Sequence, residues 1–334
     1  MSRDIAIDLG TANTLIYAAG EGIVLNEPTV IALNRENGEV LAMGHEAFRM
    51  IGRTPGYIVA ERPLRRGAIS DFDVTERYIR LLMQRAGVRR RFPRPRVLIC
   101  IPSAITGVER RAVQEAAIAA GARSAALIEE PIAAAIGAGL PIHEPTGNLV
   151  VDIGGGTSEV GVLAMGGLVV NKSVRVGGFD LDDAISKYIR REYAIVVGER
   201  TAEQIKIAIG SAFPLMEEEK AEIRGRDLAT GLPKVVQITS EEIREGIADQ
   251  LSQIIQAVVS ALAETPPELG QDILSRGIAL TGGSGLLRGL DQRLAEECDV
   301  PVHLTDKPLE CVALGAGKCL EAYGSVKDLF ISEI

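Results

Sequence analysis

One stretch near the middle of the chain combines glycines, a carboxylate and a hydroxyl at short spacing. Residues 150–162 read V-V-D-I-G-G-G-T-S-E-V-G-V, so two apolar runs flank three consecutive glycines, with Asp152 before the turn and Thr157 after it. Because these glycines carry no Cβ, successive backbone N–H groups can close around an anion such as phosphate. A carboxylate and a hydroxyl beside the turn suit a Mg²⁺ ion. The same letters also allow a tight β-hairpin that binds nothing.

The same pattern occurs at the start of the chain. Residues 5–17 read I-A-I-D-L-G-T-A-N-T-L-I-Y, and Asp8 takes the place of Asp152. Asn13 then takes the place of Thr157. A duplicated phosphate hairpin predicts two related domains that face each other across a cleft and hold a polyphosphate between them. We therefore expect Asp8 and Asp152 to share one Mg²⁺, whose charge offsets the repulsion between them.

A third glycine turn follows much later. Residues 277–290 read G-I-A-L-T-G-G-S-G-L-L-R-G-L, which predicts a buried strand, a turn and then an amphipathic helix. A strand, a glycine turn and a helix N-terminus together can seat an anion or a nucleotide. The signal is weak alone, because many α/β units turn on Gly-Gly. After two phosphate hairpins, the turn resembles the adenosine seat of the actin, Hsp70 and sugar-kinase ATPase superfamily.

Charged side chains at two further places could act on a nucleotide. Pro131 fits the first turn of a helix, which puts Glu130 at a strand-to-helix corner where it could orient a water molecule. It could equally be an ordinary helix N-terminal acid that the helix dipole favours. Glu203 and Lys206 lie one turn apart on a later helix. They form either a surface ion pair or a wall that reaches the ribose and base.

Composition limits the class of protein. At 334 residues the chain is expected to hold about two domains, and 46% apolar residues with 36 glycines are typical of an α/β protein. The net charge of -9 argues against general affinity for nucleic acid. No apolar run approaches the roughly 20 residues of a spanning helix, so we expect a soluble cytoplasmic protein whose membrane contact is peripheral. Without C-x-x-C spacing, four cysteines are interpreted as reduced core residues rather than metal or redox groups: Cys100, Cys298, Cys311 and Cys319.

An arginine-rich loop is the candidate membrane contact. Residues 89–96 read R-R-R-F-P-R-P-R, and the two prolines exclude a helix, so Phe92 is expected on a projecting loop. An exposed aromatic among arginines suits an anionic membrane surface, where each arginine could contribute about 1 kcal/mol. Alternatively, Phe92 packs back onto the body and the loop is plain solvated surface.

Local signals also predict where several elements begin and end. Residues 52–66 carry glycines, prolines and arginines and are expected to form a loop-rich insertion. Thr201 with Gln204, and Thr239 with Glu242, have the spacing of helix capping boxes. The apolar spacing after the second box predicts one helix that continues to the paired prolines.

With these motifs in view, the chain resembles the MreB-type bacterial actins, including the Mbl paralogues, over nearly its full length. The matching stretches are I-D-L-G-T-A-N-T-L-I-Y, M-I-G-R-T-P-G, E-E-P-I-A-A-A-I-G-A-G-L-P, V-V-D-I-G-G-G-T-S-E-V, E-I-R-G-R-D-L-A-T-G-L-P-K, T-P-P-E-L and L-T-G-G-S-G-L-L-R-G-L-D. The resemblance implies an α/β actin-like ATPase fold, with two ribonuclease H-like domains around a central nucleotide cleft. Domain I would span 1–145 with a small insertion at about 33–75. Domain II would span 146–334 with an insertion at about 181–240, and the C-terminal helix could return to domain I.

The resemblance also implies a role for each matching residue toward ATP or ADP and Mg²⁺. The residues that would hold the phosphates are Thr11, Ala12, Asn13, Gly154, Gly155, Gly156 and Thr157. Those that would border the ribose and base are Glu203, Lys206, Gly282, Gly283, Ser284, Gly285 and Leu286. Asp8 and Asp152 would contact the metal through water. Glu130, with help from Thr157, would position the hydrolytic water.

The function implied by the resemblance is a slow, polymerisation-coupled ATP hydrolase. It would form filaments with itself, contact the cytoplasmic membrane and organise cell-wall synthesis and rod shape with wall-elongation membrane proteins. Many relatives carry an N-terminal membrane helix, whereas only Met1 to Arg3 precede the first strand here, which leaves Phe92 as the main membrane candidate. A sugar-type kinase on the same fold is the alternative, although it would need an aspartate base where this chain has Glu130. A chaperone would need a further peptide-binding domain after Ile334.

Overall fold

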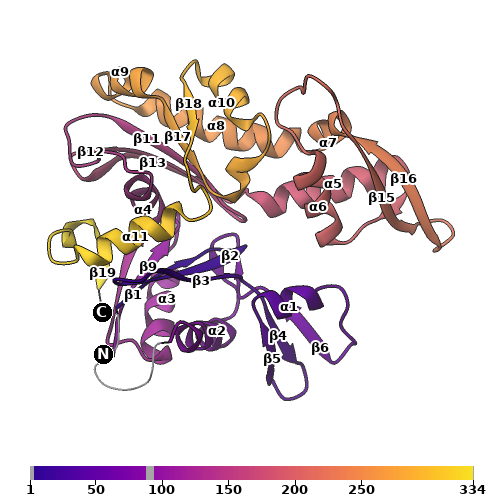
Figure 1. The fold of residues 1–334 in the computed structure, drawn as a ribbon, viewed down its shortest axis with the longest axis horizontal. Helices are drawn as coiled ribbons and strands as arrows, with labels where there is room; N and C mark the ends of the chain where they lie inside the picture. Colours follow the sequence, from indigo (N-terminus) through magenta and orange to yellow (C-terminus); the bar gives the residue numbers. More distant parts are fainter. Residues whose placement is uncertain (1–3, 88–93, 334) are drawn as a thin grey trace.

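The computed structural model describes residues 4–87 and 94–333, which form two large sheets and three small ones (Figure 1). The first large sheet has six strands in the order β19-β10-β9-β1-β2-β3. Its strands are β1 (Ile5–Leu9), β2 (Asn13–Ala18), β3 (Gly22–Pro28), β9 (Arg96–Ile101), β10 (Ser124–Glu129) and β19 (Ser332–Glu333). The first three strands pair antiparallel, and β9 and β10 continue the sheet in parallel with β1.

The second large sheet repeats this arrangement. Its order is β13-β12-β11-β17-β18. The strands are β11 (Asn148–Ile153), β12 (Ser158–Ala164), β13 (Gly167–Val174), β17 (Ile278–Thr281) and β18 (Val302–Leu304). Again an antiparallel meander leads the sheet and two parallel strands follow. The predicted duplication of the hairpin is therefore confirmed in the strand order, because β1–β2 and β11–β12 hold the same place in the two sheets.

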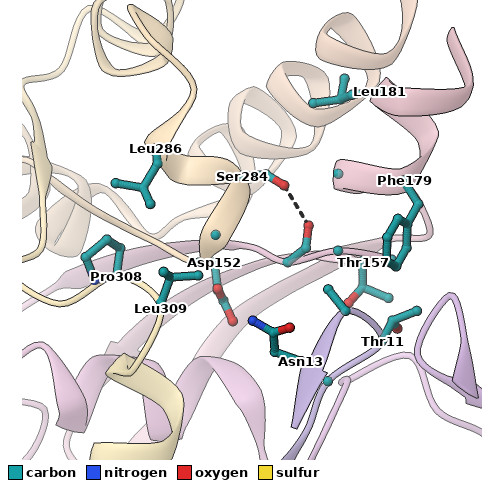
Figure 2. A pocket seen from close by; sticks show the side chains of 18 of the residues that line it. Thr11, Asn13, Asp152, Thr157, Phe179, Leu181, Ser284, Leu286, Pro308 and Leu309 are labelled. Carbon is teal, nitrogen blue, oxygen red and sulfur yellow. Dashed lines mark hydrogen bonds between the residues drawn. The ribbon is translucent and has the colours of Figure 1, made fainter. Parts of the chain in front are cut away.

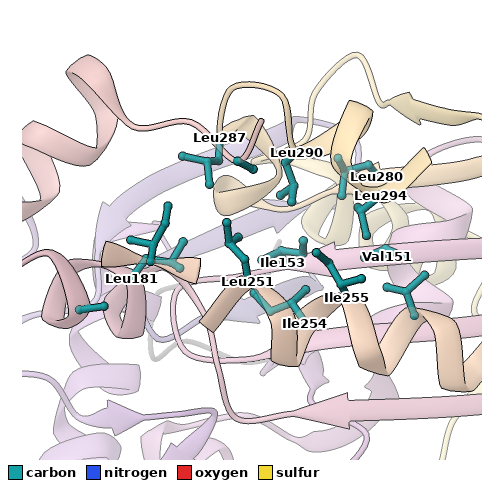
Figure 3. Close-up of a cluster of buried hydrophobic side chains, with 14 of the residues drawn as sticks. Val151, Ile153, Leu181, Leu251, Ile254, Ile255, Leu280, Leu287, Leu290 and Leu294 are labelled. Atoms are coloured by element: carbon teal, nitrogen blue, oxygen red, sulfur yellow. The ribbon is translucent and has the colours of Figure 1, made fainter. Parts of the chain in front are cut away.

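Helices cover both faces of each large sheet. Between the sheets, α4 (Glu130–Gly137) and α11 (Cys311–Glu321) share a buried cluster with strands of both sheets (Figure 1). On the outer face of the first sheet lie α2 (Phe72–Arg85) and α3 (Gly107–Ala120). The outer face of the second sheet packs against α5 (Gly178–Tyr193), α8 (Ala248–Glu264) and α10 (Leu290–Cys298), whose apolar side chains interdigitate in Figure 3. These side chains belong to the second core, the buried cluster that includes Val151, Ile153, Leu181 and Leu251.

The small sheets branch from the two halves. Strands β4 (Ile31–Asn34), β5 (Val40–Met43) and β6 (Ile58–Glu61) form one of them, next to α1 (His45–Met50). Strands β14 (Ile195–Val196), β15 (Lys220–Asp227) and β16 (Pro233–Thr239) form another, next to α6 (Glu199–Ile209) and α7 (Ser240–Gly246). The third is the hairpin of β7 (Leu64–Arg65) and β8 (Ala68–Ile69). The remaining elements are α9 (Pro267–Arg276), the 3₁₀ turn η1 (Gly283–Leu286) and the 3₁₀ turn η2 (Lys327–Leu329).

Residues 52–66 are loop-rich as predicted, although β6 and β7 lie within them. One other prediction about local structure was wrong. The single helix expected after Thr239 is two helices, α7 and α8, separated at Ile247, whose φ of -101° and ψ of 2° leave the helical region. Ile247 remains fully buried across this break, so the apolar spacing continues although the helix does not. In the described part of the chain, no helix is long and apolar enough to cross a bilayer.

The two predicted capping boxes had different outcomes. Thr239 accepts a hydrogen bond from the backbone N–H of Glu242, and the Glu242 carboxylate accepts one from the backbone N–H of Thr239. Thr201 caps nothing, because α6 already begins at Glu199 with Gly198 as its N-cap. We expect Thr239→Ala to lower the free energy of unfolding by about 1 kcal/mol, measured by urea denaturation, and Thr201→Ala to change it by less than about 0.5 kcal/mol. Equal losses from both substitutions would contradict this assignment.

Candidate functional site

A cavity of about 390 Å³ lies between the two halves, at the ends of the duplicated hairpins (Figure 2). Most of the residues assigned to a nucleotide site line it: Asp8, Thr11, Ala12, Asn13, Glu130, Asp152, Gly154, Gly155, Gly156, Thr157, Glu203, Lys206, Gly282, Gly283, Ser284 and Leu286. Gly285 is the exception, because a Cβ on this residue would point at the side chains of Leu280 and Leu304 rather than into the cavity. Phe92 lies outside the described residues.

The two hairpin turns touch each other at one end of the cavity. A Cβ on Gly155 would lie 2.6 Å from the Cβ of Ala12, and a Cβ on Gly156 would lie 2.7 Å from Oγ1 of Thr11. Both distances are shorter than non-bonded carbon and oxygen atoms allow, so only glycine permits this approach. Thr11 Oγ1 also accepts a hydrogen bond from the backbone N–H of Gly67 at 3.1 Å. The glycines therefore bring the backbones of both turns to one place, where their N–H groups could face the same anion.

Two carboxylates stand beneath these turns. Asp8 and Asp152 occupy corresponding positions on β1 and β11, and both line the cavity. Burial raises the pKa of Asp8 to about 7. The pKa of Asp152 is also raised to about 7, first by burial and then by the nearby charge of Asp8. Two buried carboxylates that repel each other in this way form a site that favours a cation.

The donor set fits magnesium held mainly by water and phosphate. Among residues 4–87 and 94–333, no group of three or more histidine, cysteine or acidic side chains is arranged to hold a metal by itself. Mg²⁺ keeps several waters and usually takes one or two carboxylates together with substrate phosphates. Asp8 and Asp152 supply hard oxygen ligands of that kind next to a turn built for phosphate.

Replacing Asp152 tests whether this carboxylate is kept for a cation at the expense of stability. Because its pKa is raised from 3.8 to about 7, the stabilisation that its bound proton provides is complete at low pH and is lost as the pH rises through about 7. We expect Asp152→Asn to raise the free energy of unfolding of the nucleotide-free protein at pH 8 by about 1–3 kcal/mol. The same substitution should abolish the gain in stability on adding ATP with Mg²⁺. Asp183→Asn is the matched control, because Asp183 is exposed and pairs with Lys187 at 2.6 Å; a destabilised Asp152→Asn would contradict the assignment.

Glu130 enters the cavity from the first turn of α4. Glu130 is the first residue after β10, and Pro131 occupies an early position of α4, as the sequence predicted. The residue is only 8% exposed. Burial raises the pKa of Glu130 well above its ordinary value, and the carboxylates of Glu159, Asp152 and Asp8 raise it further. An ordinary helix N-terminal acid would extend into solvent, whereas this carboxyl is enclosed with the other acidic groups of the cavity.

Lys206 forms an ion pair that the sequence did not predict. Its Nζ lies 2.8 Å from Oδ1 of Asp182 and donates a hydrogen bond to the carbonyl oxygen of Gly178 at 2.9 Å. The surface pair with Glu203 is absent among the described ion pairs, although Glu203 lines the same cavity. Lys206 therefore connects α6 to the first turn of α5 at the wall of the cavity.

The third glycine turn is close to the second hairpin. Gly282 has a φ of +84°, and a Cβ there would lie 2.4 Å from Oδ1 of Asp152. Ser284 donates from Oγ to the carbonyl oxygen of Gly154 at 2.9 Å, the dashed contact in Figure 2. The turn continues as the 3₁₀ turn η1, and α10 begins only at Leu290, so the predicted helix N-terminus is not at the turn.

Other lining residues were missed because no motif marks them. Pro308 and Leu309 form an apolar wall opposite Leu286 (Figure 2). Their segment is held to β17, since the carbonyl oxygen of Pro308 accepts hydrogen bonds from Thr281 Oγ1 and the Gly282 N–H, each at 3.0 Å. A flat apolar wall of this kind suits the face of a base.

Arginines of the first half reach across the mouth of the cavity. Arg62 lies 2.6 Å from the Glu199 carboxylate, and its guanidinium sits 4.1 Å from the ring centroid of Phe179. Arg66 lies 2.8 Å from the carboxylate of Asp180. Phe179 itself lines the cavity. These contacts hold the two halves together beside the glycine turns.

Comparison with known proteins agrees with this geometry. Mbl of Bacillus cereus, a cell shape-determining protein, is 51% identical over 320 residues, which is 96% of each chain. The cell shape-determining protein MreB of Escherichia coli K12 is 52% identical over 328 residues, covering 96% of this chain and 94% of that protein. The crystal structure of MreB5 of Spiroplasma citri bound to ADP superposes with a TM-score of 0.92 at 37% identity, covering 98% of both chains. A second structure of MreB5, bound to AMPPNP, gives 0.91.

The family assignment rests on the whole chain and not on the cavity alone. The sequence model described as MreB/Mbl protein matches residues 2–328. The actin-like fold expected from the sequence is confirmed by the match to MreB5. The chain belongs to the MreB/Mbl family of bacterial actins.

Proposed function

We propose that this protein binds ATP with Mg²⁺ in the central cavity, hydrolyses it slowly and forms filaments in an ATP-dependent way. The observation that carries the proposal is that two duplicated glycine turns meet beside two carboxylates, Asp8 and Asp152, in one cavity. That the relatives are cell shape-determining proteins and that MreB5 was solved with ADP and with AMPPNP support it.

Each wall of the cavity would act on a different part of the nucleotide. Backbone N–H groups of Thr11 to Asn13 and of Gly155 to Thr157 would hold the phosphates from opposite sides. The N–H of Gly154 instead closes the turn, because it donates to the carbonyl oxygen of Thr157 at 2.9 Å. Glu203 and Lys206 would border the ribose and base, with Gly283 and Ser284 beneath the base. A bound Mg²⁺ would neutralise phosphate charge and lower the pKa of the nearby carboxyls.

Hydrolysis in this site would depend mainly on the alignment of a water molecule with the terminal phosphate, and less on covalent chemistry by the protein. Glu130, with help from the Thr157 hydroxyl, would orient a water molecule in line with the terminal phosphate. No covalent intermediate with the enzyme is needed. Because only alignment and charge are supplied, a slow ATPase is expected.

The filament would act beneath the cytoplasmic membrane. By family membership, we propose that copies of the chain assemble into protofilaments, contact the inner membrane surface and organise cell-wall synthesis and rod shape with wall-elongation membrane proteins. Nucleic acid is not a proposed partner, because the net charge is -9. The protein would be cytoplasmic and peripheral at the membrane.

Sedimentation tests the proposed function. We expect the protein to pellet on adding ATP with Mg²⁺ and to release phosphate, and to stay in the supernatant in EDTA without nucleotide. A hydroxyl-bearing acceptor such as a sugar should not be phosphorylated. Failure to pellet under any nucleotide condition, or stoichiometric transfer of phosphate to the acceptor, would contradict the proposal.

The arginine-rich segment at residues 89–96 provides a membrane prediction. We expect Phe92→Ala to lower recovery of filaments with anionic liposomes several-fold, because the weak anchor of one aromatic is multiplied along a filament. Tyr57→Ala is the control, since Tyr57 is a 54% exposed aromatic in the turn just before β6. Equal recovery of Phe92→Ala and the parent would show that Phe92 is not the membrane contact.

A further inference from the structure

Asp182 is a buried carboxylate at the nucleoside end of the cavity. It lies on α5, one residue after Leu181, whose side chain packs into the second core. Asp182 is only 2% exposed and lines the cavity beside Glu203 and Lys206. Burying a carboxylate costs free energy unless its oxygens are paired and hydrogen-bonded. The partners of the Asp182 oxygens therefore decide whether the fold alone accounts for this residue.

The protein itself satisfies this carboxylate only in part. Lys206 Nζ lies 2.8 Å from Oδ1, which gives a charge partner. Neither Oδ1 nor Oδ2 completes a hydrogen bond of good geometry with any residue in 4–87 or 94–333. An ionised carboxylate offers about four acceptor positions, and buried polar atoms in native proteins are rarely left without donors. Asp182 therefore lines the cavity with acceptor positions that the described residues leave unfilled.

The surrounding charges compensate this carboxylate only in part. Lys206, its ion-pair partner, also uses one of its three N–H groups on the carbonyl oxygen of Gly178 at 2.9 Å. The other charged neighbours, Glu203 and Glu199, are acidic and raise the pKa of Asp182, which burial has already raised to about 6 despite the lysine. One cation thus compensates this carboxylate incompletely, as expected for a group with a further partner.

We infer that Asp182 accepts a hydrogen bond from an N–H or O–H donor on the nucleoside half of the bound nucleotide, and so determines which nucleoside the site selects. This inference rests on the proposed function. The phosphates of ATP with Mg²⁺ carry no such donor, so the ribose hydroxyls and the amino group of adenine are the two sources. A guanine base presents a carbonyl oxygen at the position of that amino group and would face the carboxylate with an acceptor.

Nucleotide analogues separate the two sources. Dissociation constants with Mg²⁺ are measured for ATP, 2′-deoxy-ATP, 3′-deoxy-ATP and inosine triphosphate, on the parent protein and on Asp182→Ala. We expect one analogue to bind the parent roughly 10–100-fold more weakly than ATP, because a donor to a charged acceptor has been removed. In Asp182→Ala, the affinity for ATP should fall to the affinity that the parent has for that analogue. The affinity for the analogue itself should not fall further.

The control variants distinguish a direct contact between Asp182 and the nucleotide from a purely structural role. Asp183→Ala removes a neighbouring carboxylate that is exposed and paired with Lys187, and should leave all four constants unchanged. Asp182→Asn keeps the shape and one neutral acceptor, and should reduce the discrimination in the same direction; it carries the comparison if the alanine variant does not fold. If all four nucleotides weaken by one common factor, Asp182 only holds Lys206 and the inference is overturned. A parent protein that binds ATP without discrimination overturns this inference alone, whereas a parent that binds no ATP overturns the proposed function with it.

Discussion

Glu130→Ala is expected to lower the rate of phosphate release by roughly 100-fold or more while changing ATP affinity by less than about threefold. Glu130 lies at the start of α4 inside the cavity and makes no described hydrogen bond that holds the fold together. Its proposed partner is a water molecule rather than the nucleotide, so the loss should fall on the chemical step. Single-turnover phosphate release, measured beside equilibrium ATP binding, separates the two effects.

The neighbouring acid provides the control for this prediction. Glu129 precedes Glu130 as the N-cap residue of α4, is half-buried and does not line the cavity. Glu129→Ala should therefore release phosphate within about threefold of the parent rate. Unchanged release by Glu130→Ala would remove Glu130 from the mechanism, and a loss of binding equal to the loss of rate would make it a structural residue.

Gly155→Ala is expected to weaken ATP binding by roughly 100-fold or more, because the two glycine turns could no longer meet. The new Cβ would lie 2.6 Å from the Cβ of Ala12, 3.2 Å from its backbone nitrogen and 3.3 Å from the Phe179 ring. One turn must move away from the other, which displaces the backbone N–H groups proposed to hold the phosphates. Equilibrium titration with ATP and Mg²⁺ measures the loss.

Two further variants test that the cause is this contact. Gly270→Ala adds a methyl group inside α9, where no heavy atom lies within 4 Å, and should leave ATP affinity unchanged. The double variant Gly155→Ala with Ala12→Gly removes the opposing Cβ and should recover part of the affinity. Parent-like binding by Gly155→Ala, or no recovery in the double variant, would contradict a direct contact between the turns.

The hairpins could be predicted from the sequence because their signals are local. Each apolar strand runs directly into an Asp-x-Gly turn, and the requirement for glycine follows from the short distances that surround it. The pairing of Asp8 with Asp152 followed from the repeat itself, since equivalent residues in duplicated sheets face a common cleft. Glu130 could be placed because Pro131 fixes the start of its helix.

The rest of the site depends on contacts between distant segments. Asp182 is half of an ion pair whose other member lies on the next helix, and the apolar wall of Pro308 and Leu309 carries no motif. Gly285 was assigned to the cavity with its neighbours, but successive residues of a 3₁₀ turn point in different directions, and this one faces Leu280. These positions follow from tertiary packing, which residue spacing does not encode.

Errors in the elements have the same origin. The Thr201 spacing matches a capping box, yet α6 begins two residues earlier. A short motif cannot show whether a helix has already started. The break at Ile247 could not be predicted from apolar spacing, because Ile247 and the apolar residues before and after it are all buried.

The central claim is that two opposed glycine turns hold one nucleotide and its metal. A crystal structure of the chain with a non-hydrolysable ATP analogue and Mg²⁺ tests it most directly. We expect phosphates between residues 11–13 and 154–157, with a single metal ion whose water ligands contact both Asp8 and Asp152. A nucleotide bound elsewhere, or a metal ion contacted by neither aspartate, would contradict it.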